Sequence, residues 1–227
     1  MSKELTLFEQ LERDGYTEEA ETLKKYYKNA VILKYCLAEG EIPIGASKTG
    51  CPDLPPEIEL PDMSLVIQLN MCEIAESGAD IENLLPKTGM LYIFWNPEPL
   101  EDFEDPDYDI IYWDGDMSTL RRCGNSDERE CTIGFEAHEE YDEYGVAYED
   151  LRDLVSDYGY DPGKLAYTRD KLFGYVSGGN VPEVKEDDIL LLQYGFDEGC
   201  IWNVYWITDK ESIKNHSFGS GFYYDMD

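Results

Sequence analysis

Two apolar segments that end in a glutamine constrain the fold of this chain more than any other feature. Residues 65–70 read LVIQLN and residues 190–194 read LLLQY. A run of branched apolar residues of this length is typical of a buried strand, and the glutamine gives each strand one polar side chain. Aromatic segments follow both runs, LYIFW at 91–95 and WNVYWI at 202–207. The sequence therefore predicts a pair of strands that is used twice.

Short segments upstream of the two glutamines support this repetition. Residues 48–50 (KTG) precede Gln68 at about the same separation at which residues 171–174 (KLFG) precede Gln193. A loop that contains proline lies between them in both places. A spacing that recurs in this way is typical of an internal repeat. We therefore expect an internal duplication.

The predicted fold is α+β, with internally duplicated strand pairs in a mixed or antiparallel sheet core and helices at its periphery. Residues 1–30 have the apolar spacing of an N-terminal helical hairpin that packs on the core. Residues 31–227 then form a single domain with pseudo-repeats at about 45–116 and 165–227. Residues 117–145, between the repeats, show little periodicity beyond a strand at 131–135, so we expect a largely irregular surface there. Residues 148–158 have the apolar spacing of an amphipathic helix, with Gly159 as its end.

The chain is strongly acidic. Fifty aspartates and glutamates stand against eighteen lysines and arginines, which gives the 227 residues a formal net charge of −32. Such a charge repels nucleic acids and anionic lipids, so we expect neither as a partner. The charge favours a basic protein as partner, and solubility alone is the other interpretation. Because 42% of the residues are apolar, the chain can still bury a core.

No secretory signal or membrane span is visible in the sequence. Charges interrupt the first dozen residues, and no long apolar run follows. We therefore expect a cytoplasmic protein. The cysteines are scattered without the close pairing that zinc sites need, and we expect them to be free thiols. They lie at positions 36, 51, 72, 123, 131 and 200.

The densest group of acidic residues lies at 101–116. Asp105, Asp107 and Asp109 alternate there, which would place three carboxylates on one face of an extended segment, as in a site for a divalent cation. A calcium loop that begins at Asp105 needs glycine at its sixth position and glutamate at its twelfth, and this chain has isoleucine and aspartate. We therefore expect a solvated loop beside a strand at 109–113, and no metal.

Motifs for catalysis or cofactor binding are not found in the sequence. The two histidines, His138 and His216, lie outside any recognisable nucleophile motif. No glycine-rich loop of the kind that holds the phosphates of a nucleotide occurs. We therefore expect no catalytic residue of the Ser-His or Cys-His type, and no cofactor.

A pair of carboxylates supplies the alternative hypothesis. Asp114 and Asp116 follow Trp113, and Trp95 lies on the preceding aromatic strand. Two carboxylates among aromatic rings are the chemical equipment of a glycosidase, so the alternative function is a carboxylate-dependent hydrolase of a polar or sugar-like substrate. Such an enzyme needs both carboxylates in one cleft, at least one of them with a raised pKa.

The two strand glutamines supply the candidate ligand site. A buried glutamine must satisfy four hydrogen-bonding positions, so Gln68 and Gln193 either tie neighbouring backbone together or face a cleft between the halves. If they face one cleft, Tyr92, Tyr205 and Trp206 lie around them. These five residues would then form a binding site for a ligand.

Six short motifs occur in a fixed order: SKTGCPDLP at 47–55, LVIQLN at 65–70, LLPKTGMLYIFW at 84–95, GDMSTL at 115–120, LFGY at 172–175 and LLLQ at 190–193. In this order and spacing they resemble the YwqG-like family of bacterial proteins. The resemblance implies an α+β fold with an internal duplication. It implies no activity, because that family is a domain of unknown function. Some of its members resemble accessory or immunity-type proteins found near secreted toxins.

These features predict a non-catalytic binding or protein-interaction protein of the bacterial cytoplasm. The resemblance adds an accessory or immunity-type role, and the charge adds a basic protein as the partner. The hydrolase is the alternative.

Overall fold

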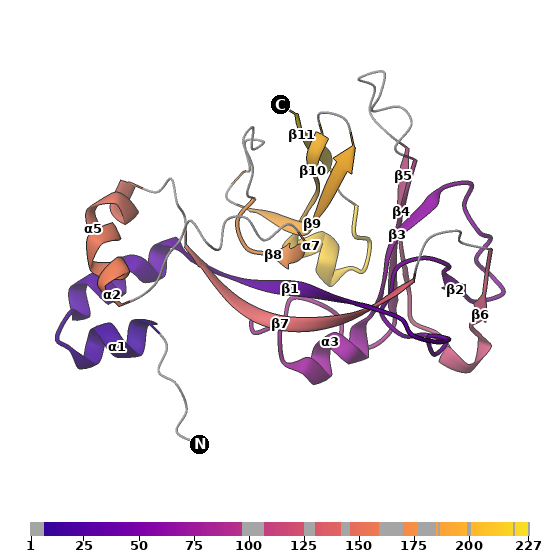
Figure 1. Cartoon of the computed structure of the whole chain (residues 1–227), viewed down its shortest axis with the longest axis horizontal. Coiled ribbons are helices and arrows are strands. Elements are labelled where there is room, and N and C mark those ends of the chain that lie inside the picture. The colour runs from indigo at the N-terminus through magenta and orange to yellow at the C-terminus, as the bar shows by residue number, and fades with distance from the viewer. Residues whose placement is uncertain are drawn as a thin grey trace.

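Two long strands form the centre of the computed structural model (Figure 1). β1 (Tyr27–Leu37) and β7 (Cys131–Tyr141) pair antiparallel over the eleven residues of each strand. The structure describes residues 7–96, 107–124, 130–141, 146–158, 170–176, 185, 187–198, 201–219 and 221–226.

The larger sheet extends from this ribbon into the C-terminal part of the chain. Every strand in it pairs antiparallel with its neighbours. In spatial order the strands are β11 (Gly221–Met226), β10 (Ile201–Asp209), β9 (Asp188–Glu198), β8 (Lys171–Phe173), β1 and β7.

A smaller sheet of three strands lies next to the edge of β7 that does not pair with β1. It consists of β3 (Ser64–Asn70), β4 (Met90–Trp95) and β5 (Tyr108–Trp113), again antiparallel. The backbone of Lys48 joins this sheet to the ribbon, because it bridges to Gln68 on β3 and to Thr132 on β7.

A two-stranded sheet completes the strands, with β2 (Asp53–Leu54) paired to β6 (Arg121–Arg122). The buried strands expected from the apolar and aromatic runs are therefore confirmed, and so is the α+β class with an antiparallel core.

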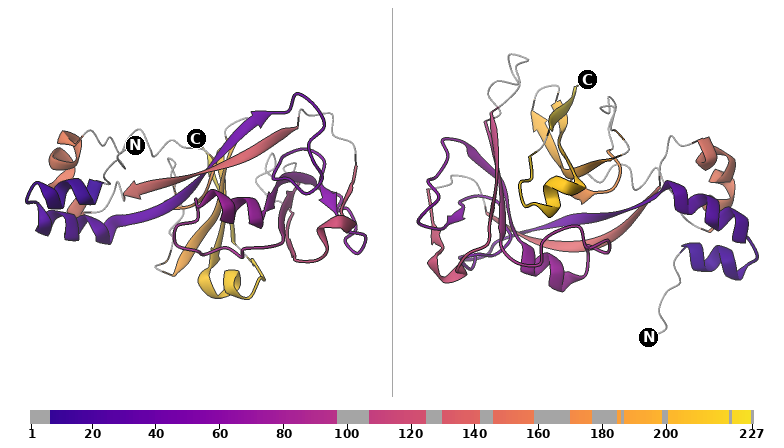
Figure 2. Two further views of the ribbon diagram at one scale, coloured as in Figure 1. Left: turned by 90° about the horizontal axis from the view of Figure 1, so that it is seen from below. Right: turned by 180° about the vertical axis from the view of Figure 1, so that it is seen from behind.

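The main hydrophobic core lies between the two groups of strands, which rise from the same side of the β1–β7 ribbon (Figures 1 and 2). Aromatic rings from both groups meet there. The ring centroid of Trp206 lies 5.9 Å from that of Trp95 and 5.4 Å from that of Phe222. Tyr108 stacks on Phe222 at 5.8 Å. These contacts join the two halves of the molecule into one packed unit.

The expected N-terminal helical pair is present as α1 (Leu7–Arg13) and α2 (Thr17–Leu23). α5 (Val146–Asp157) packs against the pair, and the three helices lie together at one end of the β1–β7 ribbon (Figures 1 and 2). They share a small apolar cluster of their own, formed by Leu7, Leu11, Ala20, Leu23 and Val155.

None of the helices that the structure describes is long and apolar enough to cross a bilayer. The remaining helical segments are short. Asn70 begins one of them, because its side chain accepts a hydrogen bond from the Cys72 N–H at 2.9 Å. Gly78, with φ of 70°, ends that helix. The segments are η1 (Lys24–Tyr26), α3 (Met71–Ser77), η2 (Met117–Thr119) and α7 (Lys210–Lys214).

Candidate functional site

Gln68, the first of the two strand glutamines, lies in a buried row of polar side chains. Gln68 stands opposite Tyr92 on β4 and opposite Lys48 on its other side, and all three side chains are fully buried. The Gln68 Oε1 accepts a hydrogen bond from the Asp53 N–H at 2.6 Å, and its Nε2 donates to the Ala46 carbonyl at 2.8 Å. Gln68 therefore ties the backbone of the loop before β3 to the sheet.

The second glutamine lies in a corresponding row on the larger sheet. Gln193 stands opposite Lys171 on β8 and opposite Tyr205 on β10. These three side chains are at most 1% exposed. Each row thus contains a lysine, a glutamine and a tyrosine on three adjacent segments of backbone.

The five residues of the predicted ligand site lie in separate places. Tyr92 packs in an apolar cluster with Leu54 and Leu120, outside the main core. Tyr205 belongs to another small cluster, and Trp206 belongs to the main core between the halves. The structure therefore brings each glutamine next to one tyrosine but does not gather all five side chains together. Ligand binding by these residues stays a prediction.

A network of buried and half-buried charges surrounds the first row. The Lys48 Nζ lies 3.3 Å from the Asp53 carboxylate and 3.6 Å from that of Glu130. The Arg122 guanidinium donates to Asp53 at 2.6 Å and to the Ile42 carbonyl at 2.8 Å, and it lies 3.4 Å from Glu130. Two cations and two carboxylates therefore compensate one another.

The pKa values of this network follow from burial and from its hydrogen bonds. Burial opposes ionisation of Asp53, but hydrogen bonds from Arg122 and the Gly45 N–H, with the Lys48 charge, hold the pKa of that carboxyl below its ordinary value. Burial lowers the pKa of Lys48, and its carboxylate neighbours only partly oppose this. The sequence motifs contained Lys48 and Asp53, whereas no local signal marked Arg122 or Glu130.

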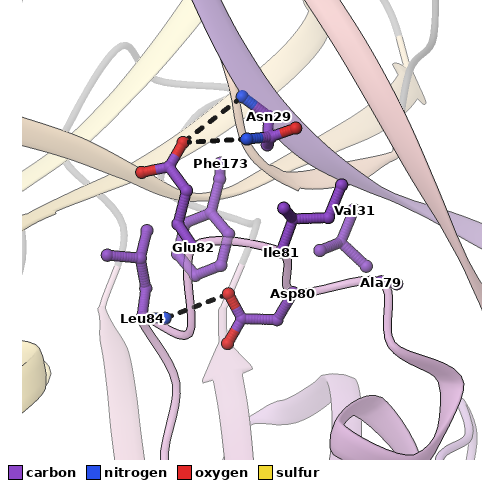
Figure 3. Close-up of a pocket in the computed structure, with 8 residues that line it drawn as sticks. All are labelled: Asn29, Val31, Ala79, Asp80, Ile81, Glu82, Leu84 and Phe173. Atoms are coloured by element: carbon purple, nitrogen blue, oxygen red, sulfur yellow. Dashed lines mark hydrogen bonds between the residues drawn. The ribbon is translucent and has the colours of Figure 1, made fainter. Parts of the chain in front are cut away.

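A shallow pocket lies where the loop after α3 crosses β1 (Figure 3). It is open to solvent and encloses no cavity, and it is lined by Val31 and Phe173 together with polar residues that already have partners. Glu82 accepts from the Asn29 side chain at 3.3 Å, and Asp80 accepts from the Leu84 N–H at 3.0 Å. Its carboxylates therefore hold the loop in place, and the pocket offers little room for a substrate.

The described acidic residues of the segment 101–116 lie immediately before β5, on β5 and in the turn after it. Asp107 and Asp109 are exposed, and neither forms an ion pair within the part of the chain that the structure describes. Asp114 accepts from the Thr88 hydroxyl at 3.1 Å, and Asp116 accepts from the Ser118 N–H at 3.0 Å. Asp105 lies outside the described residues. The described part of the acidic segment is thus a strand followed by a capped turn.

The residues of the hydrolase hypothesis lie at two ends of one sheet. Trp113 stands opposite Met90 at one end of β4, whereas Trp95 stands opposite Tyr108 at the other end. Trp95 is 4% exposed and belongs to the main core. Asp114 therefore lies near Trp113 but far along the strands from Trp95. The hydrolase stays an untested alternative.

The described residues form neither a metal-binding group nor a disulfide. Among the residues that the structure describes, no three histidine, cysteine, aspartate or glutamate side chains are grouped so that they could hold a metal ion. The described cysteines, Cys36, Cys51, Cys72, Cys123 and Cys131, are free thiols, and Cys200 lies outside the described residues.

Comparison with known proteins identifies the family. A family model described as a domain of unknown function (DUF1963) matches residues 47–227, so the chain belongs to this family. No curated protein matches the chain. The match begins after β1, which means that α1, α2 and β1 precede the part of the chain that the family model covers.

Proposed function

We propose that this member of the DUF1963 family is a non-catalytic protein-interaction protein of the bacterial cytoplasm that binds a basic partner through its acidic surface. The observation that carries the proposal is a pair of exposed carboxylates, Asp109 on β5 and Asp107 immediately before it, which have no cation beside them in the described structure. Carboxylates that no described residue neutralises are available to a partner of opposite charge.

The net charge of the chain supports the same proposal. With a formal charge of −32, the molecule attracts basic proteins over a distance and repels acidic ones before they make contact. The charged groups that are buried, such as Lys48 and Asp53, compensate each other and add little to the outer field. The field that a partner meets therefore comes from the exposed carboxylates.

The proposal is tested by capturing the partner and varying the ionic strength. Affinity capture from the native cell, with mass spectrometry of the retained proteins, should identify a basic protein. Its association rate should fall as the salt concentration rises past about 0.15 M, where charges are screened within roughly 8 Å. Association that is indifferent to salt would contradict the proposal.

Matched variants locate the charges that matter. The double variant Asp107→Asn with Asp109→Asn should slow association and leave the unfolding free energy nearly unchanged, since both side chains are exposed. The control pairs Glu18→Gln with Glu76→Gln, which removes the same charge from exposed positions on α2 and α3. Equal effects of the two double variants would show that net charge acts without a defined site.

Two finer assignments belong to this proposal. One places the chain in the YwqG-like group, with an accessory or immunity-type role. The other is an internal duplication, which is supported by the matching rows through Gln68 and Gln193. If the duplication holds, an experimental structure will superpose β3 and β4 on β9 and β10 with the two glutamines in register. A register offset by one residue would contradict it.

A further inference from the structure

β5 is an edge strand, with β4 on one side and no strand on the other among the residues that the structure describes. The Asn96 N–H donates to the Asp107 carbonyl at 2.8 Å. This bond shows which residues of β5 direct their backbone groups toward β4. In an antiparallel pair, alternate residues direct their N–H and C=O groups toward the neighbouring strand. Asp109 and Ile111 therefore face β4, whereas the backbone groups of Ile110 and Tyr112 face outward.

The outward backbone groups lie between side chains that an added strand could cover. Ile110 and Tyr112 are half-buried against the main core on one face of the sheet. Ile111 and Trp113 are half-buried against the second apolar cluster on the other face. Both faces of β5 therefore keep partly exposed apolar surface next to backbone groups that no described strand pairs.

The charges along β5 differ from those on β7, which is an outer strand of the larger sheet. On β7, Glu136 pairs with Lys34 at 3.1 Å, and Glu140 pairs with Lys171 at 2.6 Å. The segment 107–120 contains no lysine or arginine, and Asp107 and Asp109 form no ion pair with any residue that the structure describes. Soluble proteins often protect an edge strand with lysine, and here the charge has the opposite sign.

We propose that the edge of β5 is the docking site for an extended basic segment of a partner protein, which adds to the sheet as a strand beside β5. This inference rests on the proposed function, because it names the surface and the binding mode of the basic partner. Main-chain hydrogen bonds to Ile110 and Tyr112 hold the segment, and its lysines or arginines lie opposite Asp107 and Asp109.

The strand geometry fixes the spacing of the basic residues. We take the added strand to run antiparallel to β5. A partner residue opposite Asp109 then forms a non-hydrogen-bonded pair, in which the side chains of two strands come closest. The residue opposite Asp107 lies two positions away and on the same face. The segment that fits best therefore carries basic residues at alternate positions, and an apolar residue opposite Ile111 extends the same face.

Three synthetic peptides of nine residues test the binding mode. The first alternates lysine and threonine, with valine in place of the lysine expected opposite Ile111. The second has the same sequence with N-methyl groups on two threonine amides, which are the amides that would face Ile110 and Tyr112. The third has the N-methyl groups on two lysine amides, which would face away from β5. All three carry the same charge.

The first and third peptides should bind with similar affinity, and the second should bind about tenfold more weakly or worse, since two net hydrogen bonds are lost. In nuclear magnetic resonance experiments, the amide protons of Ile110 and Tyr112 should become protected from exchange with the first peptide. Asp109→Asn should weaken all three peptides. Ile110→Pro, which removes an outward N–H and keeps the ladder to β4, should weaken the first and third only.

The outcomes separate this inference from the proposed function. If all three peptides bind equally and salt weakens each of them, charge recognition stands and strand addition is overturned. If no peptide binds at low ionic strength, both proposals fail. Thermal unfolding of Ile110→Pro, compared with that of the control Ile110→Val, shows whether the proline variant is folded. A proline variant that is folded and binds the first peptide normally also overturns strand addition.

Discussion

The ammonium group of Lys171 lies 2.6 Å from the carboxylate of Glu140, and their side chains are 1% and 6% exposed. The two residues belong to β8 and β7, which are separated by β1 in the sheet. The second carboxylate oxygen of Glu140 accepts from the Tyr175 N–H at 2.7 Å. One carboxylate therefore holds both a buried cation and the chain that follows β8.

Lys171→Met should reduce the free energy of unfolding by about 3 to 5 kcal/mol, because it leaves the buried Glu140 carboxylate without its cation. The matched control is Lys34→Met, which removes the exposed pair with Glu136 and should cost less than about 1 kcal/mol. Urea unfolding followed by circular dichroism measures both values. Similar losses for the two variants would refute the structural importance of the buried pair.

Gly174→Ala should destabilise the protein more than Gly15→Ala does. Both glycines have a positive φ, 78° and 97°, so both variants carry the strain of a left-handed backbone, about 1 to 2 kcal/mol. A Cβ at Gly15 meets open space, whereas a Cβ at Gly174 collides with the Glu140 carboxylate. The difference between the two unfolding free energies, expected at about 1 to 3 kcal/mol, isolates the collision. No difference would mean that Glu140 can move aside.

Asp53→Asn should change how stability responds to acid. The folded-state pKa of Asp53 lies below its ordinary value, so its contribution is fully present above the unfolded-state pKa of about 3.9. That contribution is lost as the pH falls through the lower folded-state pKa. Unfolding free energies measured from pH 5 down to pH 2 should therefore fall less steeply in the variant than in the native protein. The exposed Asp109→Asn serves as control, and a variant slope equal to the native one would contradict the expectation.

Deletion of residues 1–46, up to the start of the family match, should abolish cooperative folding. This deletion removes β1, which pairs with both β7 and β8 in the larger sheet. Deletion of residues 1–26 is the control, since it removes α1, α2 and η1 but keeps β1 and the main core. Calorimetry should show a transition for the shorter deletion only. A folded protein without β1 would disprove its central role.

The sequence predicted best where local composition alone determines the structure. The apolar runs at 65–70 and 190–194 are buried strands, and the aromatic run at 91–95 pairs with the first of them. Contiguous apolar residues have few alternatives to burial, which explains this success. The N-terminal helical pair followed equally from the spacing of its apolar residues.

The prediction was poorest for β7. A strand was expected at 131–135 only, whereas β7 continues to Tyr141. Residues 136–140 read EAHEE, and a segment with so few apolar residues is easily mistaken for a polar surface. The partner strand β1 is far away in the chain, so no local window contains the information that pairs them.

The candidate site depended on distant residues in the same way. Lys48 and Lys171 were noticed as markers of a repeat, but their burial depends on Glu130 and Glu140, which lie on another segment of the chain. A lysine in a sequence is ordinarily expected at the surface, and only its tertiary partners reverse this. The outward direction of the Ile110 backbone groups on β5 likewise follows from the pairing of β5 with β4.

The pairing of β1 with β7 sets the order in which this chain can fold during synthesis. β3, β4 and β5 are neighbours both in the sheet and in the order of strands along this part of the chain, so they can pair with one another before β7 has been made. β1 emerges before them but has to wait, because β7 and β8 are made later. Its apolar centre, Val31 to Leu33, is then exposed on a growing chain, and such segments are targets for chaperones. Both neighbours of β1 are therefore present only once translation has passed residue 173.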